Sequence, residues 1–248
     1  MTTIITGSTG RLGEDVAKVF KGALCPKREE FDLTNANQIE QYVSKHKPEL
    51  FIHLAALVPI RDCENDKAKA WNTNVEGTRL ILNNLNKYAK NCYFVYISSP
   101  CIFSGDQGGY DEDSIPYPHS FYGITKLVSE QIIIQSGLKY LITRTNFVPK
   151  KKWLYPKAFT DRFGTYLFAD DVANGLKQMI EANEQGIRHL VGNKKISMYE
   201  LAIKTTPNVL PMTLKEYDGP QLTVDMSMTT KYEKWNRFQI SDSAEKFY

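Results

Sequence analysis

Short apolar runs alternate with amphipathic segments along the first half of the chain. Continuous apolar runs, of the kind that a parallel sheet buries on both faces, occur at residues 3–6, 50–56 and 92–99. Segments with apolar side chains at helical spacing separate these runs, at residues 35–46 and 67–88. This alternation predicts an α/β fold, a doubly wound parallel sheet with helices on both faces.

The same pattern predicts a second strand at residues 29–34, with Asp32 close to its end. In a doubly wound sheet, ligands bind beyond the carboxyl ends of the strands. The small residues Ala55 and Ala56 leave room for a ligand at one such end. His53, inside an apolar run, is interpreted as a satisfied core histidine, and no metal site is predicted because the four histidines show no ligand spacing.

A glycine motif follows the first apolar run. Gly7, Gly10 and Gly13 are spaced for a tight turn, a close approach of the backbone to a pyrophosphate, and close packing of a helix on a strand. The helical pattern that follows would add N–H donors for the anion. This strand-to-helix context predicts a dinucleotide site rather than an ordinary glycine-rich turn.

Two kinds of side chain compete as partners of the adenosine ribose in such a dinucleotide. An acid about 20 residues after the glycines favours NAD, whereas a cation favours the 2′-phosphate of NADP. Glu29 and Glu30 fit the first pattern, and Lys27, Arg28 and Arg11 fit the second. NADP is favoured because Arg11 and Arg28 can clamp the phosphate jointly.

Tyr122 and Lys126 begin an apolar segment that is predicted to be helical. Side chains four residues apart share one face of a helix, so the phenol and the ammonium project side by side. The pKa of a free phenol is about 10, and an adjacent ammonium is expected to favour the phenolate and lower that pKa. Ser99, at the end of the apolar run 92–99, can hold a carbonyl oxygen that gathers negative charge.

Composition narrows the classes of partner. A chain of 248 residues with 42% hydrophobic content can bury a full core, and its net charge of +3 is spread along the sequence, so nucleic acid is not expected. The four cysteines lack Cys-x-x-Cys spacing, which argues against a zinc site or a disulfide framework. The first strand begins by Thr3, and no apolar run approaches the roughly 20 residues of a membrane span. Neither a signal peptide nor a membrane partner is expected, and the expected location is cytoplasmic.

With these motifs in order, the chain resembles the extended short-chain dehydrogenase/reductase superfamily, in its NAD-dependent epimerase/dehydratase group. More narrowly, it looks like the dTDP-4-dehydrorhamnose reductase family. The motifs that carry the resemblance span nearly the whole chain. They are the glycine motif, Asp32-Leu33-Thr34-Asn35, Ala55-Ala56, Asn74, Ile102-Phe103-Ser104-Gly105, Tyr122-Gly123-Ile124-Thr125-Lys126-Leu127, Arg144-Thr145, Asp161-Arg162-Phe163-Gly164, and residues 169–173 and 186–192.

The resemblance implies a Rossmann domain over residues 1–148 that binds NAD(P). Over residues 149–248 it implies a small C-terminal substrate lobe, interleaved with the last elements of that domain. It also implies individual roles: Gly7, Gly10, Arg11, Leu12 and Gly13 near the pyrophosphate, Arg28, Asp32 and Leu33 at the adenosine, and Ala55, Ala56 and Leu57 on the adenine side. Tyr122 would donate a proton, Lys126 would bind the nicotinamide ribose, Ser99 would bind the substrate oxygen, and Phe147 would line the sugar pocket.

The chain departs from the family pattern at two places. Pro100 follows Ser98 and Ser99 where the family usually has an aspartate, so a carboxylate that would contact the substrate is replaced by a residue without a donor. The stretch between Arg144 and Asp161 is short for the family and carries Lys150, Lys151 and Lys152. Those lysines fit either a grip on a nucleotide diphosphate or a solvated loop.

The resemblance therefore implies an NAD(P)H-dependent reductase of a keto group on a nucleotide-activated deoxysugar. Two alternatives remain open: a nucleotide-sugar epimerase or dehydratase of the same superfamily, and a non-catalytic NADP-binding regulatory subunit. Pro100 and the shortened stretch motivate the second. The identity of the sugar and the nucleotide, and the oligomeric state, with a homodimer as one option, are left open by the sequence.

Overall fold

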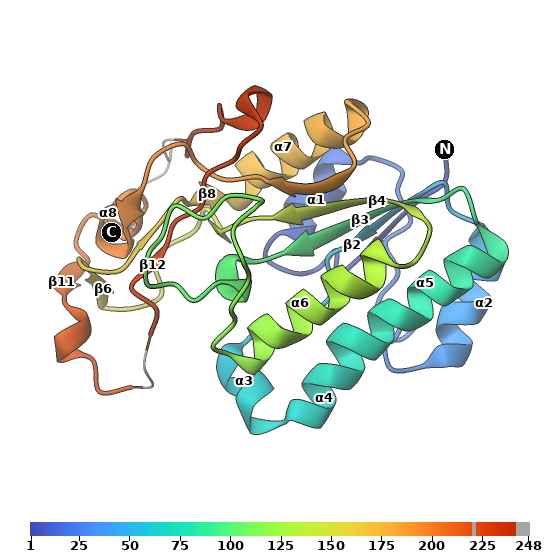
Figure 1. Ribbon diagram of the computed structural model, residues 1–248, viewed down its shortest axis with the longest axis horizontal. Helices are drawn as coiled ribbons and strands as arrows, with labels where there is room; N and C mark the ends of the chain where they lie inside the picture. Colours follow the sequence, from blue (N-terminus) through green and yellow to red (C-terminus); the bar gives the residue numbers. More distant parts are fainter. Residues whose placement is uncertain (220–221, 242–248) are drawn as a thin grey trace.

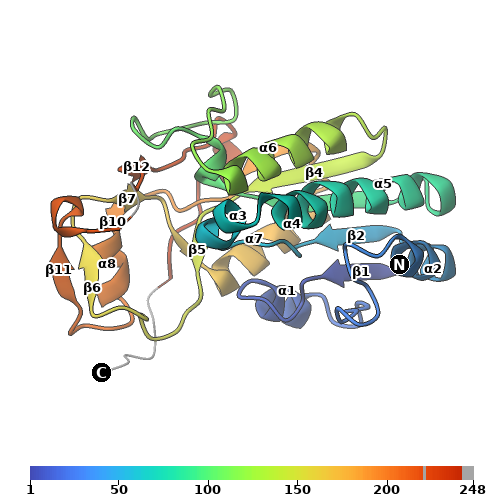
Figure 2. The ribbon, with the colours of Figure 1, turned by 90° about the horizontal axis from the view of Figure 1, so that it is seen from below.

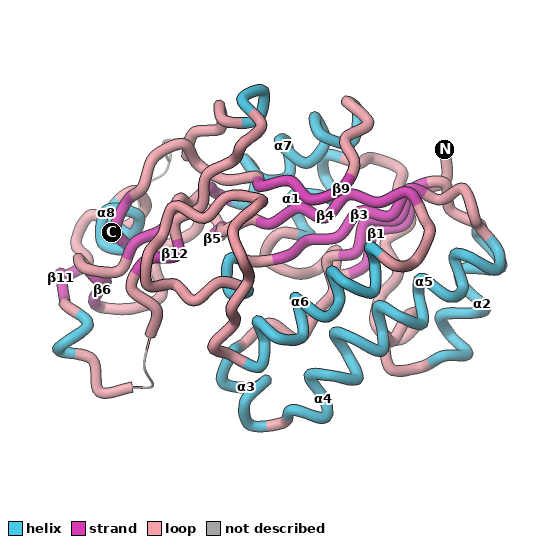
Figure 3. The backbone as a smooth tube through the Cα atoms, viewed as in Figure 1, coloured by secondary structure: helices cyan, strands magenta, loops and turns pink. Residues whose placement is uncertain are grey.

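Five parallel strands form the central sheet of the computed structural model, which describes residues 1–219 and 222–241 (Figure 3). The strand order is β1-β2-β3-β4-β9. In chain order these strands are β1 (Thr3–Thr6), β2 (Leu50–His53), β3 (Tyr93–Ser98), β4 (Lys139–Arg144) and β9 (Gly186–His189). Every neighbouring pair in this sheet is parallel. The predicted doubly wound α/β fold is confirmed.

Two layers of helices enclose this sheet (Figures 1 and 2). The helices α2 (Ala36–His46), α5 (Gly77–Tyr88) and α6 (Phe121–Ile134) cover one face, and α1 (Gly13–Val19) and α7 (Ala169–Glu181) cover the other. Alternate strand residues point to opposite faces. Ile4, Phe51 and Phe94 therefore pack under the first layer, and Ile5, Ile52 and Val95 pack under the second.

The prediction of a second strand at residues 29–34 is wrong. Residues 28–30 and 33–34 form turns, and an isolated bridge joins Leu24 to Ile4 at the edge of β1. Two backbone hydrogen bonds, Ile5 N to Leu24 O and Leu24 N to Thr3 O, hold that bridge. Asp32 therefore follows a turn rather than a strand, although Phe31 and Leu33 on either side of it are buried.

The helical segment predicted at residues 67–88 is present, but its middle is wound differently. It consists of α4 (Lys67–Trp71), a π-helical stretch (Asn72–Glu76) and α5. A π-helical turn widens the helix locally and often accompanies a functional site. Here it contains Asn74, whose side chain is buried.

The chain after β4 leaves the sheet, builds small sheets, and returns (Figure 1). Strands β5 (Phe147–Val148) and β8 (Leu167–Phe168) pair in parallel, and α7 and β9 then rejoin the central layers. Around them lie two further small sheets and one helix: β6 (Lys157–Phe159) with β11 (Leu210–Met212), β7 (Phe163–Gly164) with β10 (Ile196–Ser197) and β12 (Asp225–Met226), and α8 (Met198–Ile203). A boundary at residue 148 between two domains remains a prediction.

Candidate active site

A cavity of about 410 Å³ opens at the carboxyl ends of β1 and β2. Its lining includes these residues that the sequence predicted for the cofactor: Gly7, Arg28, Asp32, Leu33, Ala55, Ala56 and Leu57. The lining does not include Gly10, Arg11, Leu12, Gly13, Tyr122 or Lys126. Leu57 lies between the cavity and Tyr122. It lines the cavity, and it also packs against the hydrophobic cluster of Cys63, Ala70 and Tyr122.

The glycine motif folds into a turn that tolerates no side chain at two of its positions. Gly7 has φ +72°, and a Cβ there would lie 2.7 Å from the backbone N of Ala55. A Cβ on Gly13 would lie 2.0 Å from the carbonyl oxygen of Gly7. The turn thus presses the start of α1 against the loop and against β2, as the motif predicts.

We expect Gly7→Ala to lower the melting temperature more than Gly22→Ala. Gly22 has a similar φ of +83°, but a Cβ there would meet nothing within 4 Å. Its replacement costs only left-handed backbone strain, about 1 kcal/mol, whereas Gly7→Ala adds an overlap worth roughly 1–3 kcal/mol more. Thermal unfolding followed by circular dichroism would measure both, and equal losses would contradict the close approach of Gly7 to Ala55.

Arg28 and Asp32 form an ion pair at the rim of the cavity. The Nε of Arg28 lies 3.0 Å from Oδ2 of Asp32. The other carboxylate oxygen, Oδ1, accepts hydrogen bonds from the backbone N and the hydroxyl of Thr34, at 2.8 and 2.7 Å. These hydrogen bonds from Thr34 and the nearby guanidinium lower the pKa of Asp32.

Helix α6 brings Tyr122 and Lys126 to the same buried face, as the sequence predicted. Ser120 caps the helix by accepting a hydrogen bond from Gly123 N, and a Cβ on Gly123 would collide with the carbonyl oxygen of Cys101. The Nζ of Lys126 donates to the carbonyl oxygen of Ile97 at 2.6 Å and lies 3.9 Å from the ring centroid of Tyr96. Tyr122 is 7% exposed and Lys126 is 3% exposed.

The expected lowering of the Tyr122 pKa does not occur. Burial raises the pKa of Tyr122 well above 10, and Cys101 and Tyr96 raise it further, while a hydrogen bond with Ser99 opposes them. Burial lowers the pKa of Lys126 to about 7. The ammonium contacts the sheet rather than the phenol, so desolvation outweighs the charge effect.

Ser99 follows β3 and caps a short 3₁₀ turn (Pro100–Ile102), with its Oγ accepting from Cys101 N at 3.2 Å. Pro100 takes the first position of that turn, where its missing N–H would have no partner in any case. The ring of Pro100 is buried. Proline therefore fixes how the chain leaves β3 and keeps Ser99 next to Tyr122.

Asn74 connects the cavity to helix α6. Its Oδ1 accepts from Leu57 N at 2.7 Å, and its Nδ2 donates to Leu57 O and to the hydroxyl of Thr125, both at 3.0 Å. Thr125 lies between Tyr122 and Lys126 on the helix. The π-helical stretch thus fixes the position of the loop at Leu57 relative to the Tyr-Lys pair.

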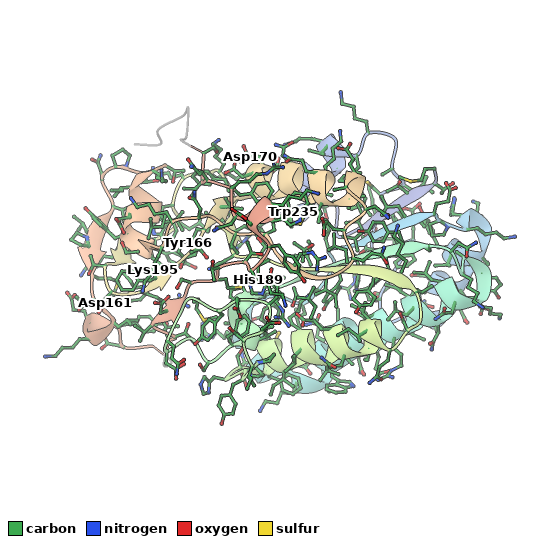
Figure 4. All side chains as sticks on the ribbon, turned by 45° about the horizontal axis from the view of Figure 1, so that its top comes forward. Asp161, Tyr166, Asp170, His189, Lys195 and Trp235 are labelled. Atoms are coloured by element: carbon green, nitrogen blue, oxygen red, sulfur yellow. The ribbon has the colours of Figure 1, made fainter. Side chains whose placement is uncertain are left out.

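The small sheets lie beyond the carboxyl ends of the central strands and face those ends. In Figure 4, Asp161, Tyr166 and Lys195 lie on this side, and His189 lies at the end of the central sheet. Lys150 pairs with Asp170 of α7 at 3.3 Å, and Lys151 pairs with Glu14 of α1 at 3.5 Å. Part of the lysine segment is thus tied to the helix that follows the glycine motif.

Phe147 forms β5 and packs against the core beneath α1 and α7. His53 is a core residue, as expected: its Nδ1 lies 2.7 Å from the hydroxyl of Thr6, and its Nε2 lies 3.2 Å from that of Thr78. Burial lowers its pKa to about 3.

The sequence model of one family, described as the RmlD substrate binding domain, matches residues 1–210. The chain belongs to this family. Among curated proteins, a dTDP-4-dehydrorhamnose reductase of Aggregatibacter actinomycetemcomitans is 26% identical, over 81% of this chain and 76% of its own length. A methionine adenosyltransferase 2 subunit beta of Xenopus laevis is 29% identical, over 80% of this chain and 69% of its own length. The structure of a Bacillus anthracis dTDP-4-dehydrorhamnose reductase in complex with NADP has a TM-score of 0.86 at 24% identity, and the match covers 98% of this chain and 96% of that one.

Membership in this family confirms the predicted resemblance, and the Bacillus anthracis match supports the Rossmann-type fold. In the described parts of the chain, no helix is long and apolar enough to cross a membrane, and no cluster of three or more potential metal ligands occurs.

Several residues around the cavity were missed in the sequence. Thr6, Ser8, Thr9, Pro26, Phe31, Lys69 and Thr73 also line it, together with Lys27 and Glu29, which the sequence offers as partners of the adenosine ribose. Lys69 and Thr73 belong to the segment of α4 and the π-helical turn. Their spacing of one helical turn is visible in the sequence, but nothing in it indicates that this part of a long helix faces the strand ends.

Proposed function

We propose that this chain is an NAD(P)H-dependent reductase of a keto group on a nucleotide-activated deoxysugar. The observation that carries the proposal is the buried Tyr122 and Lys126 pair beside Ser99, adjacent to the cavity with the glycine turn. The reductases among its relatives are named for this kind of reaction on a dTDP-linked sugar. A nicotinamide cofactor and a nucleotide-sugar substrate follow from that reading.

The residues present fit a nicotinamide dinucleotide. The absence of a side chain at Gly7 leaves space that a Cβ would fill. The cavity opens beside Ala55 and Ala56, and Arg28 lies at its rim. Bound there, the nicotinamide would supply a hydride to the carbonyl carbon. Gly10, Arg11, Leu12 and Gly13 would line the pyrophosphate, and Phe147 would line the sugar pocket.

Tyr122 donates the proton in this mechanism. Its phenol keeps its proton throughout the neutral range because burial raises its pKa. The Tyr122 hydroxyl would transfer its proton to the substrate carbonyl oxygen as that oxygen gains negative charge. Ser99 Oγ donates a hydrogen bond to the same oxygen and stabilises its charge. Lys126 would bind the nicotinamide ribose through its ammonium.

A protonated phenol favours the reductase over an epimerase or dehydratase. Those enzymes begin by oxidising the sugar, a step in which the tyrosine must act as a base. Because burial raises the pKa of Tyr122, its phenol carries the proton that a reduction consumes, and the phenolate that would act as the base is scarce. We therefore expect net consumption of the reduced cofactor.

The contacts of Asp32 favour NADP over NAD. Both oxygens of its carboxylate already accept hydrogen bonds within the chain, from Thr34 and Arg28. Fewer acceptor positions remain for a ribose diol, whereas the Arg28 guanidinium keeps donors that can reach a 2′-phosphate.

We expect Arg28→Ala to weaken NADPH binding by about tenfold or more, since it removes a charge-assisted contact, and to leave NADH binding nearly unchanged. Titration calorimetry with both cofactors would measure the ratio. Arg79→Ala is a matched control, because Arg79 on α5 pairs with Glu76 of the π-helical stretch and does not line the cavity. Equal losses of both cofactors would refute the preference for NADP.

A second function, a non-catalytic regulatory subunit, is favoured by one observation. Several of the relatives are named methionine adenosyltransferase 2 subunit beta, at 26–29% identity. Pro100, in place of the usual aspartate, fits a site that no longer needs a substrate contact. In that case the chain would bind the cofactor and a partner protein, but it would reduce no sugar.

A panel of dTDP- and UDP-linked 4-keto-6-deoxysugars, assayed for oxidation of NADPH and NADH, separates these functions. The reductase predicts stoichiometric loss of NADPH with one of the sugars. Product formation without loss of cofactor would indicate the epimerase. Tight cofactor binding with no turnover on any sugar would favour the regulatory subunit. A homodimer and a cytoplasmic location remain predictions.

A further inference from the structure

A buried ion pair lies one helical turn beyond Lys126. Glu130, on the same face of α6, is 0% exposed, and Arg144, at the end of β4, is 3% exposed. The guanidinium donates from Nε to Oε1 at 3.1 Å and from Nη2 to Oε2 at 2.7 Å. This two-bonded geometry fixes the orientation of the carboxylate.

Arg144 is fixed on its other side as well. Its Nη1 lies 3.5 Å from Nε2 of His189, and the Nδ1 of that histidine donates to the carbonyl oxygen of Thr229 at 2.7 Å. Burial lowers the pKa of His189, so its ring is neutral and Nε2 can accept. The guanidinium also lies 5.4 Å from the ring centroid of Phe103. Hydrogen bonds thus run without a break from the C-terminal segment to Glu130.

Lys126 is surrounded by groups that do not balance its charge. From β2 it faces the neutral His53, and from β3 it faces the Tyr96 ring and the Ile97 carbonyl. On its own helix lie Tyr122, which burial keeps protonated, and Glu130. Arg144, at the end of β4, donates two hydrogen bonds to the Glu130 carboxylate. In the described chain, the carboxylate that acts on Lys126 is that of Glu130.

We propose that Glu130 is a positioning residue, which keeps Lys126 in its charged form and directed at the nicotinamide ribose. The inference rests on the proposed function, because it gives the ammonium the ribose as its target. Residues four apart on a helix are close neighbours. In a buried site a fixed carboxylate at that distance acts strongly on an ammonium, because little water screens it.

The physical reason for such a residue is the cost of burying Lys126. Burial lowers the pKa of its ammonium to about 7, and Glu130 opposes that effect. Without the carboxylate, the proton would be lost within the neutral range, and with it the charge that holds the ribose. If the pair only joined α6 to the sheet, its removal would lower stability but leave the ionisation of Lys126 where it is.

The test is a titration of Lys126 in the protein without cofactor. Lysine labelled with ¹³C and ¹⁵N reports each ammonium by NMR, and the resonance missing in Lys126→Met assigns it. We expect Glu130→Gln to lower the pKa of Lys126 by about one unit, a tenfold change in the ionisation constant. Glu130→Asp keeps the charge and should restore most of the shift. The pH at which NADPH affinity is half lost should move down by the same amount.

Glu130→Gln leaves a buried guanidinium with fewer partners, which lowers the stability of this variant. The double variant Glu130→Gln with Arg144→Gln removes both charges and keeps polar side chains that can bond. Because loss of the guanidinium by itself raises the pKa of a nearby ammonium, the reference is Arg144→Gln, and Lys126 should titrate lower in the double variant than in that single variant. A folded double variant in which Lys126 titrates as in Arg144→Gln would overturn the inference. These measurements need no sugar substrate. If no keto-sugar were turned over, the proposed reductase function would be refuted, and the titration would still decide the role of Glu130.

Discussion

Tyr122→Phe is expected to lower the turnover number by a factor of about 10²–10⁴, the usual contribution of a positioned proton donor, and to leave cofactor affinity within about twofold. The phenylalanine ring keeps the packing against Cys63, Ala70 and Leu57, so the fold around the site does not change. Only the hydroxyl that protonates the substrate oxygen is lost. Steady-state kinetics with the keto-sugar, combined with NADPH titration, measure both quantities.

Tyr88→Phe is the matched control for that experiment. The Tyr88 hydroxyl donates to Glu40 at 2.6 Å, on the outer side of α5 and α2, and it is not part of the cavity lining. Its removal should leave turnover unchanged. If Tyr122→Phe kept the full biological effect and bound the cofactor normally, the chain would act as a regulatory subunit, and the enzymatic proposal would be abandoned.

The sequence was sufficient for the parts of the fold that local patterns determine. The apolar runs that became β1, β2 and β3 bury both faces, so their composition alone identifies them. The capping residues of α2 and α6, Asn35 and Ser120, also lie where helix rules expect them. The strand predicted at residues 29–34 failed because its apolar residues, Phe31 and Leu33, pack under α2 and α5 from a turn. Apolar residues that are buried from a turn give the same sequence pattern as apolar residues that are buried in a hydrogen-bonded strand.

The candidate site was predicted in its residue types but not in its electrostatics. The spacing of Tyr122 and Lys126 correctly placed them on one buried helix face. It could not reveal that the ammonium bonds to Ile97 O, or that desolvation raises the pKa of Tyr122. Depth of burial depends on every layer that packs over the helix, and that information is spread across the chain.

Long-range partners were missed for the same reason. Glu130 and Arg144 are 14 residues apart, and Arg144 and His189 are 45 apart. In the sequence, Arg144 is recognisable only as part of a family motif. Its function as the partner of Glu130 becomes visible once parallel pairing sets Arg144 opposite Ser98 in β3 and His189 in β9. Sequence reasoning needs the register of the sheet before it can pair such residues.

Lys126→Met should make the protein more stable and nearly inactive. The ammonium is buried without a carboxylate in contact, and replacement of a buried charge by an apolar side chain of similar size stabilises a protein by about 1–4 kcal/mol. For a domain of this size, each kcal/mol raises the melting temperature by about 2–4 °C. Turnover should fall by about 10³ or more, because the ribose contact and the charge beside the site are both lost.

The stability gained by Lys126→Met depends on pH, because the pKa of Lys126 is lower in the folded protein than in the unfolded chain. The pKa of Lys126 is lowered from 10.5 to about 7 in the folded protein. Between these values the unfolded chain binds a proton that the folded chain does not, so this lysine makes wild-type stability rise with pH. Below pH 7 the cost of the buried ammonium is constant and largest. The advantage of Lys126→Met should therefore be full at pH 6 and nearly gone at pH 10.5.

Melting curves of both proteins from pH 6 to pH 10 measure this crossover. Lys87→Met is the matched control, because Lys87 lies on the surface of α5 and pairs with Glu40. Its replacement should give no gain at any pH in this range. A Lys126→Met variant that melts below the wild type at pH 6 would mean that the contacts with Ile97 O and the Tyr96 ring outweigh desolvation. The buried ammonium would then stabilise the fold, and Lys126 would cost the protein no stability.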